Sequence, residues 1–349
     1  MSPTIAIFSD PAPRAARLAL ALDGGLSLPG GTIAVYRPRA GEDFAPLRPA
    51  GVQMVQSFRP DFDALTQAGW SVSATPTPAP AALICLPRAK AEGLALIAGA
   101  IAQGAALVLV DGQKTDGVEA VLKSVRARTE VQGTVSKAHG KLFWFAPGDA
   151  DFSDWHAQTL TLEDPLLGRF QTLPGVFSAD GIDPGSALLA QALPDTLPAR
   201  MGDLGAGWGY LSAACLARKG VEEMHLIEAE AQALDLARGA ISDPRARFHW
   251  ADACNFTLPA PLGGIVMNPP FHTGRKAEPA LGLAFIAAAA QALGPRGSLW
   301  MVANRHLPYE RALERHFVTH EVLAETGAFR VWQARNLRKT SKTAPGAHR

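Results

Sequence analysis

RMGDLGAGWGY, residues 200–210, decides the fold of this chain, because a short apolar run leads into a turn with three glycines. Glycine permits a tight turn and lets a ligand approach the backbone closely. The N–H groups at the start of a following helix attract an anionic group. The sequence therefore predicts a strand, a ligand-binding turn and a helix, with a purely structural turn as the alternative. The residues expected to contact the ligand are Asp203, Gly205, Ala206 and Gly207.

Two acidic residues follow the next two predicted strands. Glu228 closes the strand 224–228, where a carboxylate accepts hydrogen bonds from both ribose hydroxyls of a nucleotide-like ligand. Asp252 follows the strand 246–251, where it can accept from an adenine amino group. Glu230 is a second candidate for the ribose, and each acid could instead cap a helix or lie in solvent.

The motif Asn268-Pro269-Pro270-Phe271 comes directly after the apolar run GGIVM. Ligands in open α/β sheets bind beyond the carboxyl ends of the strands, so we expect this motif at the same edge as the glycine turn. The amine of a planar base is a poor nucleophile, because its lone pair is delocalised into the ring. The Asn268 side-chain oxygen and the Pro269 carbonyl can accept both amine hydrogens and turn the lone pair toward a methyl donor.

Proline fixes the backbone of this turn and has no N–H that would compete for the carbonyls. The Phe271 ring offers a face on which a planar acceptor can stack. No metal is needed, because the sulfonium of S-adenosylmethionine carries the activation and the protein supplies positioning. Asn268–Phe271 is thus the predicted catalytic site, and Asn268 also faces the predicted cofactor; an ordinary turn after a strand is the alternative.

The second half of the chain alternates short apolar runs with helical spacing. The predicted strands are 200–204, 224–228, 246–251, 264–267, 298–303, 321–324 and 329–334. The predicted helices are 210–219, 231–241, 278–293 and 309–316. The last two strands follow each other across a short turn, so the pattern predicts the class I methyltransferase fold with a closing antiparallel pair.

The first half also alternates strands and helices, which predicts a mainly parallel sheet covered by helices. The predicted strands are 4–8, 82–86, 105–110 and 141–145, and the predicted helices are 14–22, 89–103 and 118–128. A chain of 349 residues exceeds one ordinary core. We expect one domain over residues 1–155, a catalytic domain over 156–335 and a basic flexible tail over 336–349.

The composition and the lack of targeting segments indicate the broad class of protein. Apolar residues make up 48% and charged residues 19%, which is typical of a globular protein. A formal charge of +1 means that any affinity for nucleic acid must come from local basic patches. The N-terminus lacks the pattern of a signal peptide, no apolar run is long enough to span a bilayer, and the scattered cysteines suit a reducing compartment, so we expect a cytoplasmic protein without membrane partners.

Further candidate residues have weaker signals. His316 and His320 have a helical spacing that could hold zinc, but no glutamate or third ligand accompanies them, so we expect no metal site. Arg275 and Lys276, just after the catalytic motif, could contact a phosphate or lie in a solvated loop. The basic tail, with Arg338 and Lys339, could bind RNA or simply be solvated.

With these motifs in view, the chain resembles the bacterial ribosomal RNA guanine-N2 methyltransferases, in particular the family that acts on the small subunit. The resemblance covers the whole chain and is sharpest in the second half. The stretches that carry it are LPGVFSADGIDPGSALL (173–189), DLGAGWG (203–209), MNPPFHTG (267–274), ANRHLPYERALERHF (303–317) and FRVWQAR (329–335).

The resemblance implies an α/β protein with two tandem class I methyltransferase-like, Rossmann-like domains, of which the N-terminal copy is degenerate. ICLPRAK (84–90) stands where an active copy would carry the catalytic motif. Asp203, Gly205 and Gly207 would hold the methionine portion of the cofactor, Glu228 the ribose and Asp252 the adenine. Phe177 and Ser178 would close over the cofactor, and the N-terminal domain would support folding and RNA docking. Trp208, a bulky residue in the glycine turn, departs from the pattern.

The expected reaction is methyl transfer from S-adenosylmethionine to N2 of a guanine in ribosomal RNA, most simply the 16S RNA. The expected partner is therefore ribosomal RNA or a ribosomal subunit. Methylation of a protein glutamine amide or of adenine N6 is an alternative, because both acceptors pose the same lone-pair problem. A non-catalytic RNA-binding assembly factor is a third.

Overall fold

The computed structural model describes residues 12–48, 50–270 and 279–338. It divides into two compact units, each built around its own seven-stranded sheet. The N-terminal unit comprises Met1–Leu160, Thr172–Ala179 and Glu230–Gln232, and the C-terminal unit comprises Thr161–Gln171, Asp180–Ala229 and Ala233–Arg349. Within the described residues, no helix has the length and apolar content to cross a membrane.

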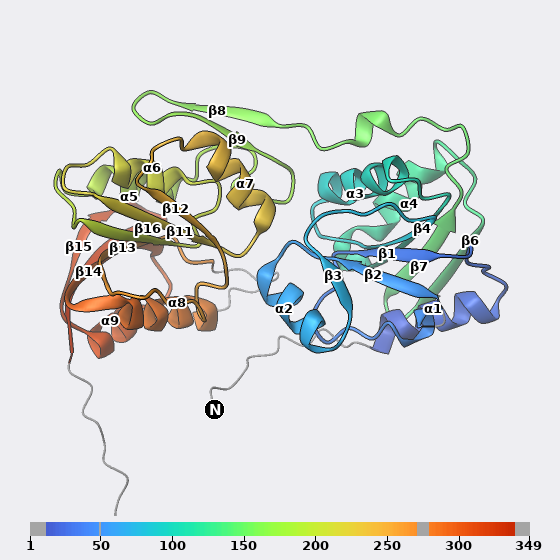
Figure 1. The fold of residues 1–349 in the computed structure, drawn as a ribbon, viewed down its shortest axis with the longest axis horizontal. Coiled ribbons are helices and arrows are strands. Elements are labelled where there is room, and N and C mark those ends of the chain that lie inside the picture. Colours follow the sequence, from blue (N-terminus) through green and yellow to red (C-terminus); the bar gives the residue numbers. More distant parts are fainter. Residues whose placement is uncertain (1–11, 49, 271–278, 339–349) are drawn as a thin grey trace, which may run out of the picture. The chain divides into compact units, whose positions relative to one another are not determined.

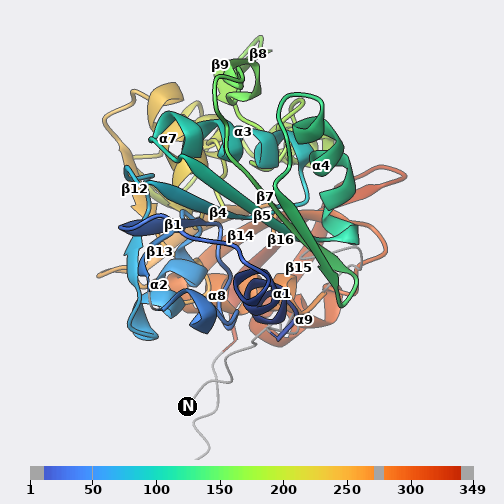
Figure 2. The ribbon, with the colours of Figure 1, turned by 90° about the vertical axis from the view of Figure 1, so that its right-hand side faces the viewer.

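The sheet of the N-terminal unit has the order β3-β2-β1-β4-β5-β7-β6. Its strands are β1 Thr32–Tyr36, β2 Gly51–Val55, β3 Ser71–Ser73, β4 Ala81–Cys85, β5 Leu107–Gln113, β6 Gly133–Lys137 and β7 Gly140–Phe145. Its helices are α1 Ala12–Asp23, α2 Arg59–Gln67, α3 Lys90–Ala102 and α4 Val118–Arg126. Helices α3 and α4 cover one face of the sheet and α1 covers the other (Figure 2).

Several elements of this unit were not predicted from the sequence. The sequence pattern predicted no strand where β1, β2, β3 and β6 lie. The predicted strand 4–8 lies outside the described residues. Strand β2, GVQMV, carries a polar glutamine and is only partly buried, and β3 has three residues, so neither gives a clear alternation. Short, partly buried strands are held by their neighbours in the sheet more than by their own sequence.

The sheet of the C-terminal unit has the order β12-β11-β10-β13-β14-β16-β15. Its strands are β10 Arg200–Leu204, β11 Glu223–Glu228, β12 Ala246–Trp250, β13 Leu262–Met267, β14 Leu293–Asn304, β15 Phe317–Glu325 and β16 Phe329–Leu337. Its helices are α5 Pro184–Ala192, α6 Tyr210–Leu216, α8 Pro279–Ala292 and α9 Glu310–His316, and α7 spans Ala231–Ala240. Helices α5 and α6 cover one face, and α8 and α9 cover the other (Figure 1).

All seven predicted strands of this sheet are present, and β14, β16 and β15 form the expected antiparallel closure. The sequence did not predict helix α5 or the separate hairpin of β8 Leu160–Asp164 and β9 Gly168–Thr172. Strand β16 runs to Leu337, two residues into the segment expected as a tail.

The two sheets share one strand order, so their equivalent positions can be compared. Tyr36 pairs with Ile84 in the first sheet, as Leu204 pairs with Met267 in the second. The next residues are Arg37 and Cys85 in the first sheet, where the second has Gly205 and Asn268. The buried Cys85 thiol is a weaker hydrogen-bond acceptor than the Asn268 side-chain amide at the equivalent position.

Candidate active site

The glycine turn joins β10 to α6 at the carboxyl edge of the C-terminal sheet. The Gly205 N–H donates to the Ile227 carbonyl at 2.9 Å, which ties the turn to the neighbouring strand β11. Gly205, Gly207 and Gly209 have φ angles of 76°, 55° and 92°, a left-handed conformation that glycine adopts without strain. The predicted strand, turn and helix are all present.

Gly207 and Gly209 are glycines for different reasons. A Cβ atom at Gly209 would lie 2.8 Å from the Ile241 side chain, so packing excludes a larger residue there. A Cβ atom at Gly207 would meet nothing within 4 Å in the described part of the chain. The turn therefore presents bare backbone to open space at Gly207, which suits a ligand that lies against it.

Trp208, the bulky residue of the glycine turn, is part of the protein core. Its ring is buried and packs against Phe170 at 5.2 Å and Tyr210 at 5.7 Å between ring centroids. The Tyr210 hydroxyl in turn donates to Asp164 at 3.0 Å. Trp208 thus belongs to a buried aromatic cluster that packs against the glycine turn.

Two of the three predicted acidic ligand-binding residues lie at this turn. Glu228 ends β11, and its carboxylate accepts a hydrogen bond from the Gly207 N–H at 2.7 Å. Asp203 is fully buried in β10 and accepts from the Ser212 hydroxyl at 2.7 Å. Glu230, the competing candidate for the ribose, is grouped with the N-terminal unit.

Asp203 is an unusual carboxyl group. Burial, with a smaller contribution from the charge of Glu228, raises its pKa to about 7. Its second oxygen, Oδ1, is buried without a hydrogen-bond partner in the described residues. A buried acceptor that lacks a partner fits a ligand that brings a hydrogen-bond donor or a positive charge, and S-adenosylmethionine carries both on its methionine portion.

Asp252 follows β12 and shapes its own loop. One carboxylate oxygen accepts from the Cys254 N–H at 2.9 Å and the other from the Asn255 side-chain amide at 2.6 Å. A helix cap and a solvated strand end were the predicted alternatives to the adenine contact, whereas these two bonds lie within the loop after β12. A carboxylate oxygen has two lone pairs, so these bonds leave room for a further donor.

Asn268 follows β13, the strand that pairs with β10. Its side-chain nitrogen Nδ2 donates to Asp183 Oδ2 and to the Ser186 hydroxyl, each at 2.9 Å. Both partners lie at the start of α5, where Asp183 is the N-cap and also accepts from the Ser186 N–H at 2.7 Å. Neither residue was predicted to have a role, although an Asp-Pro pair, which is typical of a helix start, lies within segment 173–189.

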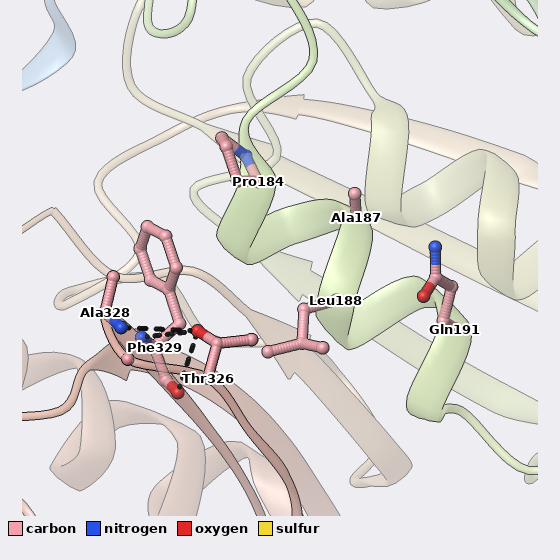
Figure 3. Close-up of a pocket in the computed structure, with 8 residues that line it drawn as sticks. Pro184, Ala187, Leu188, Gln191, Thr326, Ala328 and Phe329 are labelled. Carbon is pink, nitrogen blue, oxygen red and sulfur yellow. Dashed lines mark hydrogen bonds between the residues drawn. The ribbon is translucent and has the colours of Figure 1, made fainter.

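A shallow pocket lies beside the same start of α5. It has a volume of about 510 Å³ and lies between α5 and the turn that joins β15 to β16. Figure 3 shows Phe329 near Pro184, with Thr326, Ala328 and Leu188 around it. Its walls are mainly apolar, which suits a planar group better than a charged one.

The sequence also predicted further residues for the site. Phe177 and Ser178 are grouped with the N-terminal unit, and the Phe177 ring is half exposed. Phe271, Arg275, Lys276 and Lys339 lie outside the described residues. Arg338 is described, and its Nε donates to the backbone carbonyls of Glu314 and Phe317 at 2.7 and 2.9 Å.

The histidine pair considered for zinc does not share a helix. His316 ends α9, whereas His320 lies in β15 with its Nε2 3.6 Å from Glu310 Oε1. In residues 12–48, 50–270 and 279–338, no group of three or more His, Cys, Asp or Glu side chains is placed to hold a metal ion.

The open space at Gly207 leads to a prediction. Gly207→Ala is expected to weaken S-adenosylmethionine binding at least about tenfold, because the new methyl group enters that space, and to cost about 1 kcal/mol of stability, because φ is 55°. Calorimetric titration and denaturant unfolding measure the two effects. Gly239→Ala in α7, where a Cβ also meets nothing within 4 Å, is the control. Equal cofactor affinity in the two variants would show that the turn is not the binding site.

Comparisons with known proteins agree with this geometry. The family model of the methyltransferase small domain matches residues 168–333. The ribosomal RNA small subunit methyltransferase C of Hahella chejuensis is 32% identical over 248 residues, which cover 69% of this chain and 72% of the relative. The protein of the same name from Klebsiella pneumoniae is 34% identical over 208 residues, or 58% of each chain.

A solved structure extends the likeness to both units. The 16S rRNA N2 methyltransferase of T. thermophilus, determined in complex with AdoMet and guanosine, has 25% sequence identity to this chain and a TM-score of 0.75. The match covers 93% of this chain and 94% of that one.

Proposed function

Because the chain belongs to the ribosomal RNA small subunit methyltransferase C family, we propose that it transfers a methyl group from S-adenosylmethionine to N2 of a guanine in 16S ribosomal RNA. One observation carries the proposal. The glycine turn and the Asn-Pro-Pro turn follow β10 and β13, which are neighbouring parallel strands in register from Met201–Gly264 to Leu204–Met267. The predicted cofactor loop and the predicted amine-binding loop therefore leave the sheet side by side.

We propose that the Asn-Pro-Pro turn acts through hydrogen-bond acceptors. Because Nδ2 of Asn268 is bonded to Asp183 and Ser186, its oxygen Oδ1 is the group left to accept a substrate N–H. The Pro269 carbonyl is the second proposed acceptor. Holding both amine hydrogens in one plane directs the nitrogen lone pair out of that plane, toward the methyl donor. Phe271 is proposed as the stacking face for the guanine ring.

S-adenosylmethionine supplies an electrophilic methyl group on a positively charged sulfur. We assign the methionine portion to Asp203, Gly205, Ala206 and Gly207, the ribose to Glu228 and the adenine to Asp252. The buried oxygen of Asp203 and the open space at Gly207 support the first of these assignments. Phe177 is proposed to close over the bound cofactor.

The N-terminal unit has no proposed chemistry. We propose that it supports folding and helps to dock the RNA, together with the basic residues Arg275, Lys276, Arg338 and Lys339. A ribosomal substrate would place the protein in the cytoplasm, where ribosomal RNA and assembling subunits are its partners.

The proposal is tested by incubating the protein with labelled S-adenosylmethionine and three acceptors: naked 16S RNA, small subunits and large subunits. We expect label in 16S RNA and N2-methylguanine after nuclease digestion. Recovery of N6-methyladenine or of methylglutamine in ribosomal protein would replace the proposed acceptor. Binding of RNA without binding of the cofactor would instead indicate an assembly factor.

A further inference from the structure

The side-chain amide of Asn268 is held on its nitrogen side by two acceptors from another part of the chain. An amide nitrogen has two hydrogens, and here one reaches Asp183 Oδ2 and the other the Ser186 hydroxyl, each at 2.9 Å. Turning the amide over would bring its oxygen against the Asp183 carboxylate, an acceptor that cannot donate when it is ionised. The two contacts therefore allow one orientation, with Oδ1 pointing away from α5.

We propose that Asp183 and Ser186 are positioning residues for methyl transfer, which fix Asn268 with its oxygen toward the acceptor amine. The inference rests on the proposed function, because it assigns an orientation to the residue that receives the amine. The substrate amine would donate to Asn268 Oδ1, and Asn268 Nδ2 donates to the Asp183 carboxylate, so the two hydrogen bonds point in the same direction. In such a run each bond polarises the next, so the charge of Asp183 makes Asn268 Oδ1 a stronger acceptor.

Both residues are themselves held firmly. Asp183 caps α5, since its Oδ2 accepts from the Ser186 N–H at 2.7 Å, and Pro184 occupies the first helical position. Ser186 is buried. At Gly185, a Cβ would lie 3.0 Å from both Asp183 Oδ2 and the Phe329 ring, so glycine lets the carboxylate and β16 approach the helix start. The acceptors for Asn268 thus come from a helix start that is packed in place.

Helix capping alone would explain Asp183 without Asn268, so the test must separate the two roles. Ser186→Ala removes one acceptor and leaves the cap, because the cap uses the backbone N–H of residue 186. Asp183→Asn keeps the shape of the cap and removes the charge. We expect each variant to lower kcat about five- to tenfold with an unchanged KM for the cofactor. Ser186→Thr keeps the hydroxyl group and is expected to keep most of the wild-type kcat. Ser124→Ala, which removes a partly exposed serine hydroxyl from α4, is the control.

A double-mutant cycle gives the decisive result. In an Asn268→Ala background, Ser186→Ala and Asp183→Asn should change the residual rate by less than about twofold, because they act through the missing amide. A full five- to tenfold loss in that background would mean that they stabilise the fold or contact the substrate directly, and would overturn the proposal.

A readout without substrate separates this inference from the proposed function. The side-chain amide protons of Asn268, assigned in nitrogen-15 NMR spectra by their disappearance in Asn268→Ala, should both be protected from exchange with water in the wild type. Ser186→Ala should expose one of them, whatever molecule accepts the methyl group. If both Asn268 amide protons exchange freely in the wild type, the positioning role is wrong, even if the enzyme methylates 16S RNA as proposed.

Discussion

Asn268→Ala is expected to lower the turnover number about 100- to 1000-fold, while the Kd for S-adenosylmethionine changes less than about threefold. Removal of one preorganised hydrogen-bonding group at the reacting centre of an enzyme typically has an effect of this size. The cofactor should be little affected, because the contacts of Asn268 in the structure run to Asp183 and Ser186 and not to the glycine turn.

Single-turnover methylation of small subunits and calorimetric titration with the cofactor measure the two quantities. Gln191→Ala, which removes an exposed amide from the same helix α5, controls for loss of amide groups in general. Asn268→Ala also leaves Asp183 with one donor fewer, so a small loss of stability, about 1 kcal/mol, is expected beside the kinetic effect. A parallel loss of turnover and cofactor affinity would mean that the site has been assigned to the wrong loop.

The C-terminal unit could be predicted from its sequence because several signals agree there. Four features each mark the carboxyl end of a strand: the glycine turn, the two acidic residues and the Asn-Pro-Pro motif. The apolar runs that precede them are long enough to be identified as strands. The N-terminal unit has no such markers. Strand β1, for example, follows two glycines in a stretch without any motif, and only its pairing with β2 and β4 identifies it.

In the candidate site, too, residues in a local motif could be predicted, whereas partners that are distant in the sequence could not. Asn268 was found from its local motif, whereas its partner Asp183 lies 85 residues earlier in the chain. Nothing local links the two, because the contact exists only when α5 packs at the carboxyl edge of the sheet. Trp208 is a similar case. Its role in packing depends on Phe170, which lies on the unpredicted strand β9.

The second large effect concerns Asp203, whose pKa is raised to about 7 by burial and then by the charge of Glu228. The ordinary pKa of an aspartate is 3.8, so the unfolded chain releases this proton above about pH 4. The folded protein keeps the proton up to about pH 7. The folded state therefore binds more protons in this window, and its stability falls as the pH rises from about 4 to about 7. A shift of this size corresponds to roughly 4 kcal/mol at the top of the window.

Asp203→Asn removes that titration and adds an amide group that lacks one partner, at a cost of about 1–3 kcal/mol. The cofactor-free variant should thus be more stable than the wild type at pH 8, by about 1–3 kcal/mol, with the advantage shrinking toward pH 5. Denaturant unfolding at the two pH values measures this difference. Asp235→Asn, which neutralises an exposed carboxylate on α7, should show no such pH dependence.

The same substitution is expected to weaken S-adenosylmethionine binding about 10- to 100-fold, because a neutral amide cannot pair with a cationic group as a carboxylate does. Wild-type affinity should increase as the pH rises through about 7, since the cofactor prefers the ionised form that the empty fold disfavours. Asp203 would then lower the stability of the free protein and strengthen its complex. If Asp203→Asn binds the cofactor as tightly as the wild type, or if wild-type affinity is flat between pH 6 and 8, Asp203 is a buried structural carboxyl and not a ligand of the methionine portion.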